Sequence, residues 1–298
     1  MDSNMPQHLN KQPSKPRRVV ILGSGGFIGR KLSEKLAASG IEVQGVRSSD
    51  INLCSADSAV ALRAIFRPDD VVVFAAAITP DKGKDVRTFM RNLQMAENVA
   101  TALEGIALSH MIYISSDAVF ADDLPPITES TPADPPTIYG LMHLAREKIL
   151  ASVLEKTKTP SLVLRPCTIY GPGDTHDSYG PNRFLRSALG ERKIKLFGQG
   201  EEKRPQLYIH DLIAILLEAL LRRTTGLLNV APGESASFGS IAQQIIRLVN
   251  NGTSVESMTR SGPVTHRHFA PSNLLRAFPR ISFTPLETAL HQFLRELT

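Results

Sequence analysis

The amino-acid sequence predicts an α/β protein with a doubly wound parallel sheet and a smaller C-terminal lobe. Three observations carry this prediction. Strand-like apolar runs alternate with helical patterns over residues 18–165, the first run stops at a glycine-rich turn, and the pattern changes after Pro166. Such alternation is typical of a parallel sheet with helices on both faces. The chain has 298 residues, 42% of them hydrophobic, which is enough for a sizeable core in about one to two domains.

The individual elements follow from periodicity. Buried strands are predicted at 18–22 (RVVIL), 41–46, 71–77 (VVVFAAA), 111–115 (MIYIS) and 161–165 (SLVLR). Helices are predicted over 27–36, which ends at Gly40, over 86–107 and over 139–154, the last after a Pro-rich loop at 124–136. Residues 18–165 are therefore expected to form one domain built around the parallel sheet.

The remaining chain is expected to divide into a short tail and a second lobe. Residues 1–17 are basic and rich in Pro, Gln and Asn, which predicts a disordered tail. Residues 170–183 are rich in Gly and Pro, and helices follow at 184–190, 211–222 and 237–250. We expect 166–298 to be mainly a substrate-binding lobe, with one or two elements within about 206–230 returning to the main sheet.

Composition excludes several classes of function. Cys54 and Cys167 are too few for a disulfide framework, which indicates a reducing compartment. The apolar stretch at 212–221 is shorter than the roughly 20 residues that span a bilayer, and residues 1–17 lack the apolar stretch of a secretory signal. The net charge of +5 owes much to the tail, and no basic stripe with interleaved aromatics is visible. We expect a cytoplasmic protein that binds neither membranes nor nucleic acid.

The glycine-rich turn at 23–29 predicts dinucleotide binding, because it joins a buried strand to an amphipathic helix. Gly23 permits the tight turn, Gly26 lets the backbone approach a pyrophosphate at the helix N-terminus, and Gly29 allows helix and strand to pack closely. This is the arrangement of a Rossmann-type domain. The predicted cofactor-binding residues of the turn are Gly23, Ser24, Gly25, Gly26, Phe27, Ile28 and Gly29.

Arg47 ends the second predicted strand, at the position where an acidic residue binds the ribose of NAD and a basic residue favours the 2'-phosphate of NADP. Together with Ser48 and Ser49, it favours NADP over NAD. The alternative is a solvated arginine at a strand end, which leaves the preference open. Asn52 and Leu53, a few residues further on, are also assigned to the cofactor side.

Several ordered motifs then resemble one known family, the extended short-chain dehydrogenase/reductases, also called the NAD-dependent epimerase/dehydratase family, which acts mainly on nucleotide sugars. The resemblance covers about residues 18–249. The matching motifs are GSGGFIG (23–29), FAAA (74–77), Asn92 within a helix, ISSDAVF (114–120), YGLMH (139–143), LRPCTIYGPG (164–173) and RPQLYIHDL (204–212).

The resemblance implies a role for each matching residue. Tyr139 is the general acid/base, and Ser116 hydrogen-bonds the same substrate oxygen. His143 and Asp117 complete the implied catalytic group, while Asn182 and Arg204 contact the nucleotide and diphosphate of a nucleotide-diphosphate sugar. The remaining residues implied to lie at the cofactor, alongside Tyr139 and His143, are Ala75, Ala76, Ala77, Asn92 and Pro166. The resemblance also implies a homodimer through the helices that contain Asn92 and Tyr139.

His143 departs from the family motif Tyr-x-x-x-Lys. The family lysine holds the nicotinamide ribose and lowers the pKa of the tyrosine, whereas a neutral imidazole offers a hydrogen bond without a permanent charge. Three interpretations stay open: histidine is a working substitute, the chemistry is slow or altered, or the protein is a non-catalytic NAD(P)-binding sensor or scaffold. Arg146, one turn further along the helix, is a possible source of charge.

The triplet Ser116-Asp117-Ala118 bears on the reaction. Family dehydratases usually have Thr-Asp-Glu here, and Ala118 cannot act as the base, so 4,6-dehydration is disfavoured. The pattern Ser-Asp-x-Val-Phe is similar to reductases that finish deoxysugars, whereas the motif around Arg204 is shared with epimerases. Epimerase and 4-ketoreductase both stay open. No metal site is expected, because His266 and His268 have no third ligand indicated by the sequence.

Overall fold

A seven-stranded sheet forms the centre of the molecule. The structure, a computed structural model, describes residues 6–297. The sheet order is β1-β11-β6-β5-β4-β2-β3, and every neighbouring pair is parallel except β1 with β11. Its strands are β1 (Gln7–His8), β2 (Arg18–Leu22), β3 (Glu42–Val46), β4 (Val71–Phe74), β5 (His110–Ile114), β6 (Ser161–Pro166) and β11 (Thr224–Val230). The predicted doubly wound parallel sheet is confirmed.

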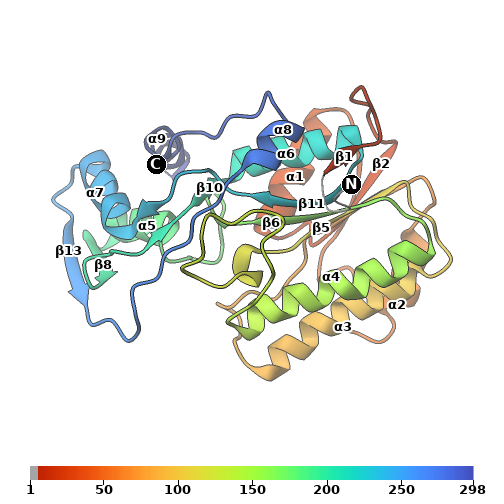
Figure 1. Cartoon of the computed structure of the whole chain (residues 1–298), viewed down its shortest axis with the longest axis horizontal. Coiled ribbons are helices and arrows are strands. Elements are labelled where there is room, and N and C mark those ends of the chain that lie inside the picture. The colour runs from red at the N-terminus through yellow and green to blue at the C-terminus, as the bar shows by residue number, and fades with distance from the viewer. Residues whose placement is uncertain (1–5, 298) are drawn as a thin grey trace.

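Helices cover both faces of this sheet, which explains why β2, β4 and β5 are buried along their whole length. One face carries α2 (Ser58–Ile65), α3 (Val86–Leu103) and α4 (Ile138–Lys156); the other carries α1 (Phe27–Ala38) and α6 (Ile209–Arg222) (Figure 1). Two apolar cores result, one on each side of the sheet. The strand predicted at 71–77 ends at Phe74, and the helix predicted to reach residue 107 ends at Leu103.

The N-terminal segment corrects the prediction of a disordered tail. Residues 6–17 are placed, and β1 pairs with the outer edge of β11. The His8 ring bonds Thr224 Oγ1 through Nδ1 (2.9 Å) and Ala277 O through Nε2 (2.8 Å), and Asn10 Nδ2 donates to Leu221 O. These contacts supply partners that composition alone does not reveal. Residues 1–5 of the predicted tail lie outside the described residues.

The C-terminal lobe lies to one side of the sheet, on the left in Figure 1. It contains α5 (Pro181–Gly190), α7 (Phe238–Val249), α9 (Leu286–Leu297) and the parallel pair β8 (Lys193–Phe197) and β13 (Ser254–Met258). Two short pairs join it to the main domain, β7 (Thr168–Tyr170) with β10 (Gln206–Tyr208) and β9 (Lys203–Arg204) with β12 (Ala236–Ser237). A small helix, α8 (Ser272–Ala277), packs near β11.

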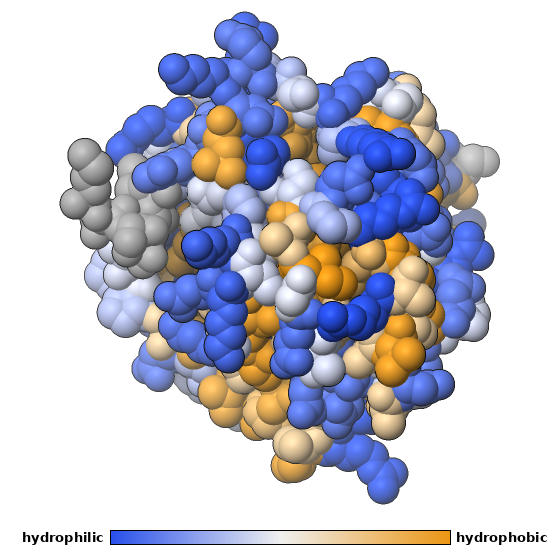
Figure 2. All heavy atoms as spheres, turned by 90° about the vertical axis from the view of Figure 1, so that its right-hand side faces the viewer, coloured by the Kyte–Doolittle hydropathy of each residue, from blue (hydrophilic) through white to orange (hydrophobic). Residues whose placement is uncertain are grey.

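The surface at the right-hand side of Figure 1 carries a few groups of hydrophobic side chains surrounded by hydrophilic ones (Figure 2). Within residues 6–297, no helix is long and apolar enough to cross a membrane.

Strand order fixes where a ligand site belongs. The chain runs outward from β2 to β3 and then returns to place β4 on the other side of β2. Ligands of such sheets bind in the crevice at the carboxyl ends of the strands, where the order reverses. The loops at this edge follow β2, β4, β5 and β6, and they contain most of the residues that the sequence singled out.

Candidate active site

The glycine-rich turn between β2 and α1 is built by close backbone contacts. Gly23 has a φ of +94°, and a Cβ added there would lie 2.8 Å from Ala76 Cα. A Cβ on Gly29 would lie 2.2 Å from Gly23 O, so no other residue fits at this position. The turn therefore leaves the N-terminus of α1 open beside the chain that leaves β4. This cradle fits the pyrophosphate of a dinucleotide.

Arg47 lies directly against this turn. A Cβ on Gly25 would meet Arg47 Cγ at 3.5 Å, and the Arg47 amide donates to Asp50 Oδ2 (2.9 Å). Within the described residues, the Arg47 guanidinium makes no hydrogen bond or ion pair, so it is available to an anion. Asn52 Oδ1 accepts from the Cys54 amide (3.2 Å). The Leu53 side chain is buried in the core, and its carbonyl accepts from Asn98 Nδ2 (2.8 Å), so the structure does not present Leu53 to a ligand.

The segment that leaves β4 is held by Asn92. Ala75, Ala76 and Ala77 follow β4, and the backbone of Ile78 then pairs with the buried side chain of Asn92 on α3. Asn92 Oδ1 accepts from Ile78 N (2.9 Å), and Nδ2 donates to Ile78 O (3.0 Å) and Thr88 O (3.1 Å). Asn92 thus positions this wall of the cleft, with its whole amide engaged by protein groups.

Ser116 begins a short turn, η1 (Asp117–Val119), after β5. Ser116 Oγ accepts from Ala118 N (3.1 Å) and lies 3.4 Å from Asp117 Oδ1. The Asp117 carboxylate is bound by Arg267 (2.9 Å), which also binds Asp122 (2.6 Å). Burial opposes the charge of Arg267, but the two carboxylates raise its pKa. The Asp117 side chain is therefore engaged in an ion pair with Arg267.

Tyr139 lies in the first turn of α4, which Thr137 caps through a hydrogen bond from Gly140 N (3.2 Å). A Cβ on Gly140 would lie 1.9 Å from Ala118 O, so α4 touches the turn that begins at Ser116. The motifs containing Ser116 and Tyr139 are thus brought together. The pKa of Tyr139 is raised to about 12, chiefly by burial; Arg146 opposes this rise, and Asp117 and Asp81 add to it.

His143 is buried behind Tyr139. Its ring packs edge-on against the Tyr139 ring, with centroids 4.8 Å apart, and its Nδ1 hydrogen-bonds the Tyr113 hydroxyl (2.8 Å). Nε2 is buried without a partner. Burial, and then Arg146, hold the pKa of His143 well below its usual value, so the imidazole is neutral near pH 7. An unpartnered imidazole nitrogen in this cleft fits a ribose hydroxyl.

The two residues expected to bind substrate are engaged by the protein. Arg204 on β9 donates to Thr265 Oγ1 (2.6 Å) and Asp122 Oδ2 (3.2 Å), and burial lowers its pKa. Asn182 is buried on α5; its Oδ1 accepts from Gly171 N (2.9 Å), and its Nδ2 donates to Asp174 Oδ2 (2.7 Å). Pro166 ends β6 beside the same edge of the sheet. Asn182 therefore shapes a loop, and Arg204 joins the network around Asp117.

That loop, residues 171–177, crosses the cleft, and we call it the strap. Arg30 on the first turn of α1 donates to Gly173 O (2.7 Å) on one side. On the other side, His176 Nδ1 lies 3.1 Å from Thr79 Oγ1 and 3.4 Å from Asp81. The strap thus connects the helix that follows the glycine turn with the segment that follows β4.

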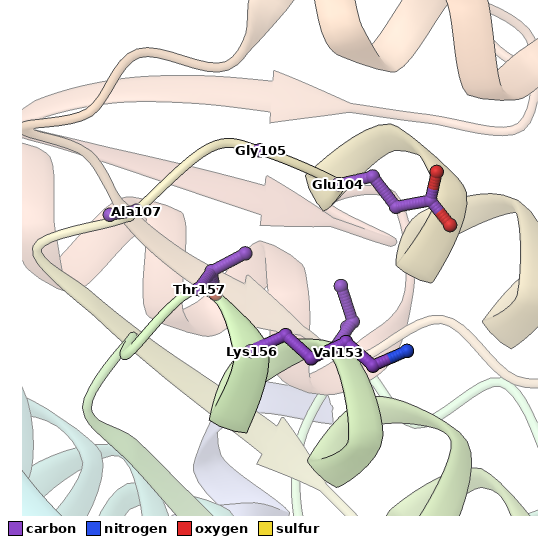
Figure 3. Close-up of a pocket in the computed structure, with 6 residues that line it drawn as sticks. All are labelled: Glu104, Gly105, Ala107, Val153, Lys156 and Thr157. Carbon is purple, nitrogen blue, oxygen red and sulfur yellow. The ribbon is translucent and has the colours of Figure 1, made fainter.

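Two hollows differ in position. A cavity of about 480 Å³ has Tyr139 in its wall and an apolar lining that includes Ile78, Pro80, Phe89, Ile138 and Met142. The hollow in Figure 3, about 400 Å³, lies between the ends of α3 and α4, beside Glu104 and Lys156. It borders the amino edge of the sheet, away from every predicted site residue. The cavity at Tyr139 is therefore the better candidate for the substrate.

Sequence reasoning missed four contributors to the site: Arg30, Tyr113, His176 and Arg267. Tyr113 sits in an apolar run that predicts only a buried strand, and Arg267 lies in a C-terminal loop. Arg30 and His176 meet their partners across long stretches of chain. Only Arg267 had a signal in the sequence, because it lies between His266 and His268. The other three residues had none.

Within the described residues, no group of three or more His, Cys, Asp or Glu side chains could hold a metal ion.

Residues 19–231 match the NAD dependent epimerase/dehydratase family, which covers well over half of the chain. The chain belongs to this family. A dTDP-4-dehydrorhamnose reductase of Mycolicibacterium smegmatis is 30% identical over 278 residues, which are 91% of this chain and 78% of that protein. The chain spans 55 to 66% of the length of four further curated relatives, at 25 to 27% identity.

Solved structures of the family have the same fold. A GDP-L-fucose synthetase from Naegleria fowleri bound to NADP has a TM-score of 0.82 at 20% identity, covering 99% of this chain and 97% of that one. A UDP-glucose 4-epimerase of Thermus thermophilus in complex with NAD has a TM-score of 0.81 at 20% identity, covering 94% and 98%. Family members thus include NAD(P)-dependent reductases and epimerases of nucleotide sugars.

Proposed function

We propose that this protein is an NADP-preferring oxidoreductase of a nucleotide-diphosphate sugar. The observation that carries the proposal is the contact between α4 and the turn at Ser116, which brings the segments bearing Tyr139 and Ser116 together. Both lie at the carboxyl edge of the sheet, where the glycine turn and Arg47 are suited to a dinucleotide. The roles of Tyr139 and Ser116 in catalysis, and those of Asn182 and Arg204 in binding, are expectations from the family.

The cradle at Gly23 and Gly29 and the unpartnered His143 Nε2 fit a nicotinamide dinucleotide. When bound, its nicotinamide supplies or accepts the hydride. In reduction, the Tyr139 hydroxyl donates a proton to the substrate oxygen, and Ser116 Oγ hydrogen-bonds that oxygen. In the reverse direction Tyr139 accepts the proton. The neutral His143 is able to hold a ribose hydroxyl through Nε2 while Tyr113 fixes its ring.

A 4-keto reduction is favoured over 4,6-dehydration, because Ala118 offers no base beside Asp117 and Asp117 is already paired with Arg267. The 30% identity to a dTDP-4-dehydrorhamnose reductase points in the same direction. Epimerisation remains the second candidate, because the motif at Arg204 is one that epimerases share. The two differ in whether the cofactor is released after each turnover.

The test is turnover of 4-keto nucleotide sugars by the wild type and by Tyr139→Phe. The variant should lose at least about 100-fold in kcat, because general acid catalysis is removed while packing is kept. Tyr208→Phe is the matched control, since the Tyr208 hydroxyl is buried without a partner in the described residues.

Two outcomes would contradict the proposed function. Full activity of Tyr139→Phe on a proven substrate would exclude the assigned role of Tyr139. Tight dinucleotide binding without turnover of any nucleotide sugar would instead support a non-catalytic sensor or scaffold.

A further inference from the structure

Arg146 is a fully buried cation on α4, two turns beyond Tyr139 and one turn beyond His143. Its Nη2 donates to Ala76 O (2.8 Å), in the segment that borders the glycine turn. The guanidinium carbon lies 4.3 Å from the centroid of the Phe74 ring and 5.2 Å from that of Tyr113. Its Nε is buried without a partner.

No carboxylate within the described residues pairs with Arg146. The neighbouring Glu147 is taken by Arg165, which donates to both of its oxygens (2.9 and 2.7 Å), and by Ser115 (2.5 Å). Asp117 is taken by Arg267. A buried cation is costly unless it is paired. The Ala76 carbonyl, the Met142 sulfur (3.9 Å from Nη1) and two aromatic faces compensate only part of that cost. The Arg146 guanidinium therefore keeps a positive charge that no described carboxylate neutralises.

The titratable groups next to the Arg146 guanidinium include the phenols of Tyr113 and Tyr139 and the imidazole of His143. Arg146 acts on Tyr113 and Tyr139, and in both cases it opposes the rise in pKa that burial causes. It also disfavours a second positive charge on His143. Asp117 and Asp81 are the acids that act on Tyr139 in the opposite sense, and Cys54 is a further titratable group near Arg146.

We propose that Arg146 is a positioning residue that supplies, from beneath the site, the positive charge that lysine supplies in the family motif. The proposal rests on the function proposed above. It divides the work of one lysine between two residues: His143 keeps the hydrogen bond to a ribose hydroxyl, and Arg146 keeps the charge that stabilises the ionised form of Tyr139. The bond to Ala76 O fixes the guanidinium at this depth.

A purely structural role would require only the hydrogen bond to Ala76 O and the packing on Phe74. A glutamine retains an amide donor and loses the charge, whereas a lysine retains the charge and loses the planar fork. Arg146→Gln and Arg146→Lys therefore separate the two roles. The readout is the ionisation of Tyr139, measured as the tyrosinate ultraviolet absorbance of each protein minus that of the same protein carrying Tyr139→Phe.

We expect Arg146→Gln to raise the pKa of Tyr139 and so to lower its tyrosinate absorbance at about pH 11 roughly tenfold, and Arg146→Lys to leave that absorbance nearly unchanged. His143→Lys added to Arg146→Gln should lower the Tyr139 pKa again, because a lysine at 143 restores a cation. If folded Arg146→Gln titrates like the wild type, the proposal is wrong.

His143→Lys alone keeps the test decisive if Arg146→Gln does not fold. Because Arg146 already supplies a charge, the added lysine should lower the Tyr139 pKa by less than about one unit. A larger drop would mean that the wild type lacks the charge, which contradicts the proposal. The titration needs no substrate, so absence of dinucleotide binding or turnover in the wild type would count against the proposed function alone.

Discussion

At the scale of single residues, the chemistry of the candidate site depends on which charged side chains form ion pairs and which do not. Asp117 and Glu147 face arginines, Arg146 faces none of the described carboxylates, and His143 is neutral. The spacing of Tyr139 and His143 predicts that they share a helix face, but it does not predict that Tyr113 will occupy Nδ1. The residue types at the site were thus visible in the sequence, whereas their pairing required the fold.

Arg47 leads to a prediction about the cofactor. The aliphatic part of its side chain lies against Gly25 of the glycine turn, and its guanidinium has no partner among the described residues, so it is suited to a 2'-phosphate. Arg47→Asp should weaken NADPH binding at least about 10-fold and strengthen NADH binding, because a carboxylate accepts a hydrogen bond from a ribose hydroxyl and repels a phosphate. Calorimetric titration measures both affinities.

Arg280→Asp is the control for Arg47→Asp, because it makes the same change of charge at an exposed position between α8 and α9. Equal loss of NADPH affinity in both variants would attribute the effect to net charge, and an unchanged NADPH affinity in Arg47→Asp would remove Arg47 from the cofactor site.

His110 leads to a prediction about stability and pH. It is buried at the start of β5, with Nε2 2.8 Å from Thr224 O, and burial lowers its pKa to about 4. The unfolded chain titrates near 6.5, so below that pH the unfolded state binds the proton more tightly. The contribution of neutral His110 to stability is therefore complete above about pH 6.5 and is lost as the pH falls to about 4, by about 3 kcal/mol.

Denaturant unfolding of the wild type and His110→Gln across this range checks the sign. The variant should lose the part of the pH dependence that lies between about pH 6.5 and 4. His291→Gln, at an exposed position on α9, should keep it. If His110→Gln retained the full dependence, the depressed pKa of His110 would be refuted.

At the scale of elements, periodicity located five of the seven strands of the sheet and the long helices to within a few residues. It did not predict β1, and it gave β11 only as part of a returning element within about 206–230. The glycine turn, the segment after β4, the turn at Ser116 and the start of α4 follow from that topology, because parallel strands end at one edge. The strap was not predictable in the same way. Its contacts, Arg30 with Gly173 and His176 with Thr79, join residues 143 and 97 positions apart, and no local pattern encodes them.

The strap leads to a prediction about cofactor release. It crosses the cleft between the first turn of α1 and the segment after β4, so a bound dinucleotide should leave faster when one end is untied. His176→Ala should raise the dissociation rate of NADP(H) roughly fivefold, because one modest hydrogen bond is lost. Stopped-flow fluorescence of NADPH release measures this, with His291→Ala as a control. Equal rates for both variants and the wild type would mean that the strap does not gate release.

At the scale of the whole molecule, α3 and α4 leave apolar side chains uncovered. Val86 and Met90 on α3 are 69% and 56% exposed, and Ile138 and Leu141 on α4 are 41% and 46% exposed. The two helices pack side by side, and exposed apolar side chains on neighbouring helices are typical of an interface. The family resemblance implies that the partner is a second copy of the chain.

Light scattering should therefore give the mass of a dimer at micromolar concentration. Met90→Lys combined with Leu141→Lys should shift the protein to a monomer, because burying two ammonium groups is costly. Val60→Lys, at an exposed position on α2, is the control. A wild-type monomer under these conditions would exclude the dimer.

The short strand β1 has a consequence for how the protein behaves in solution. β11 would otherwise end the sheet with a row of free amide and carbonyl groups, which invites strand addition by a neighbouring molecule. Gln7 and His8 occupy part of that row, and His8 also holds α8 against it through Ala277. Trimming or fusing the protein near residue 10 therefore risks self-association without touching the cleft, so aggregation of a shortened chain would report on this protected edge and not on the chemistry.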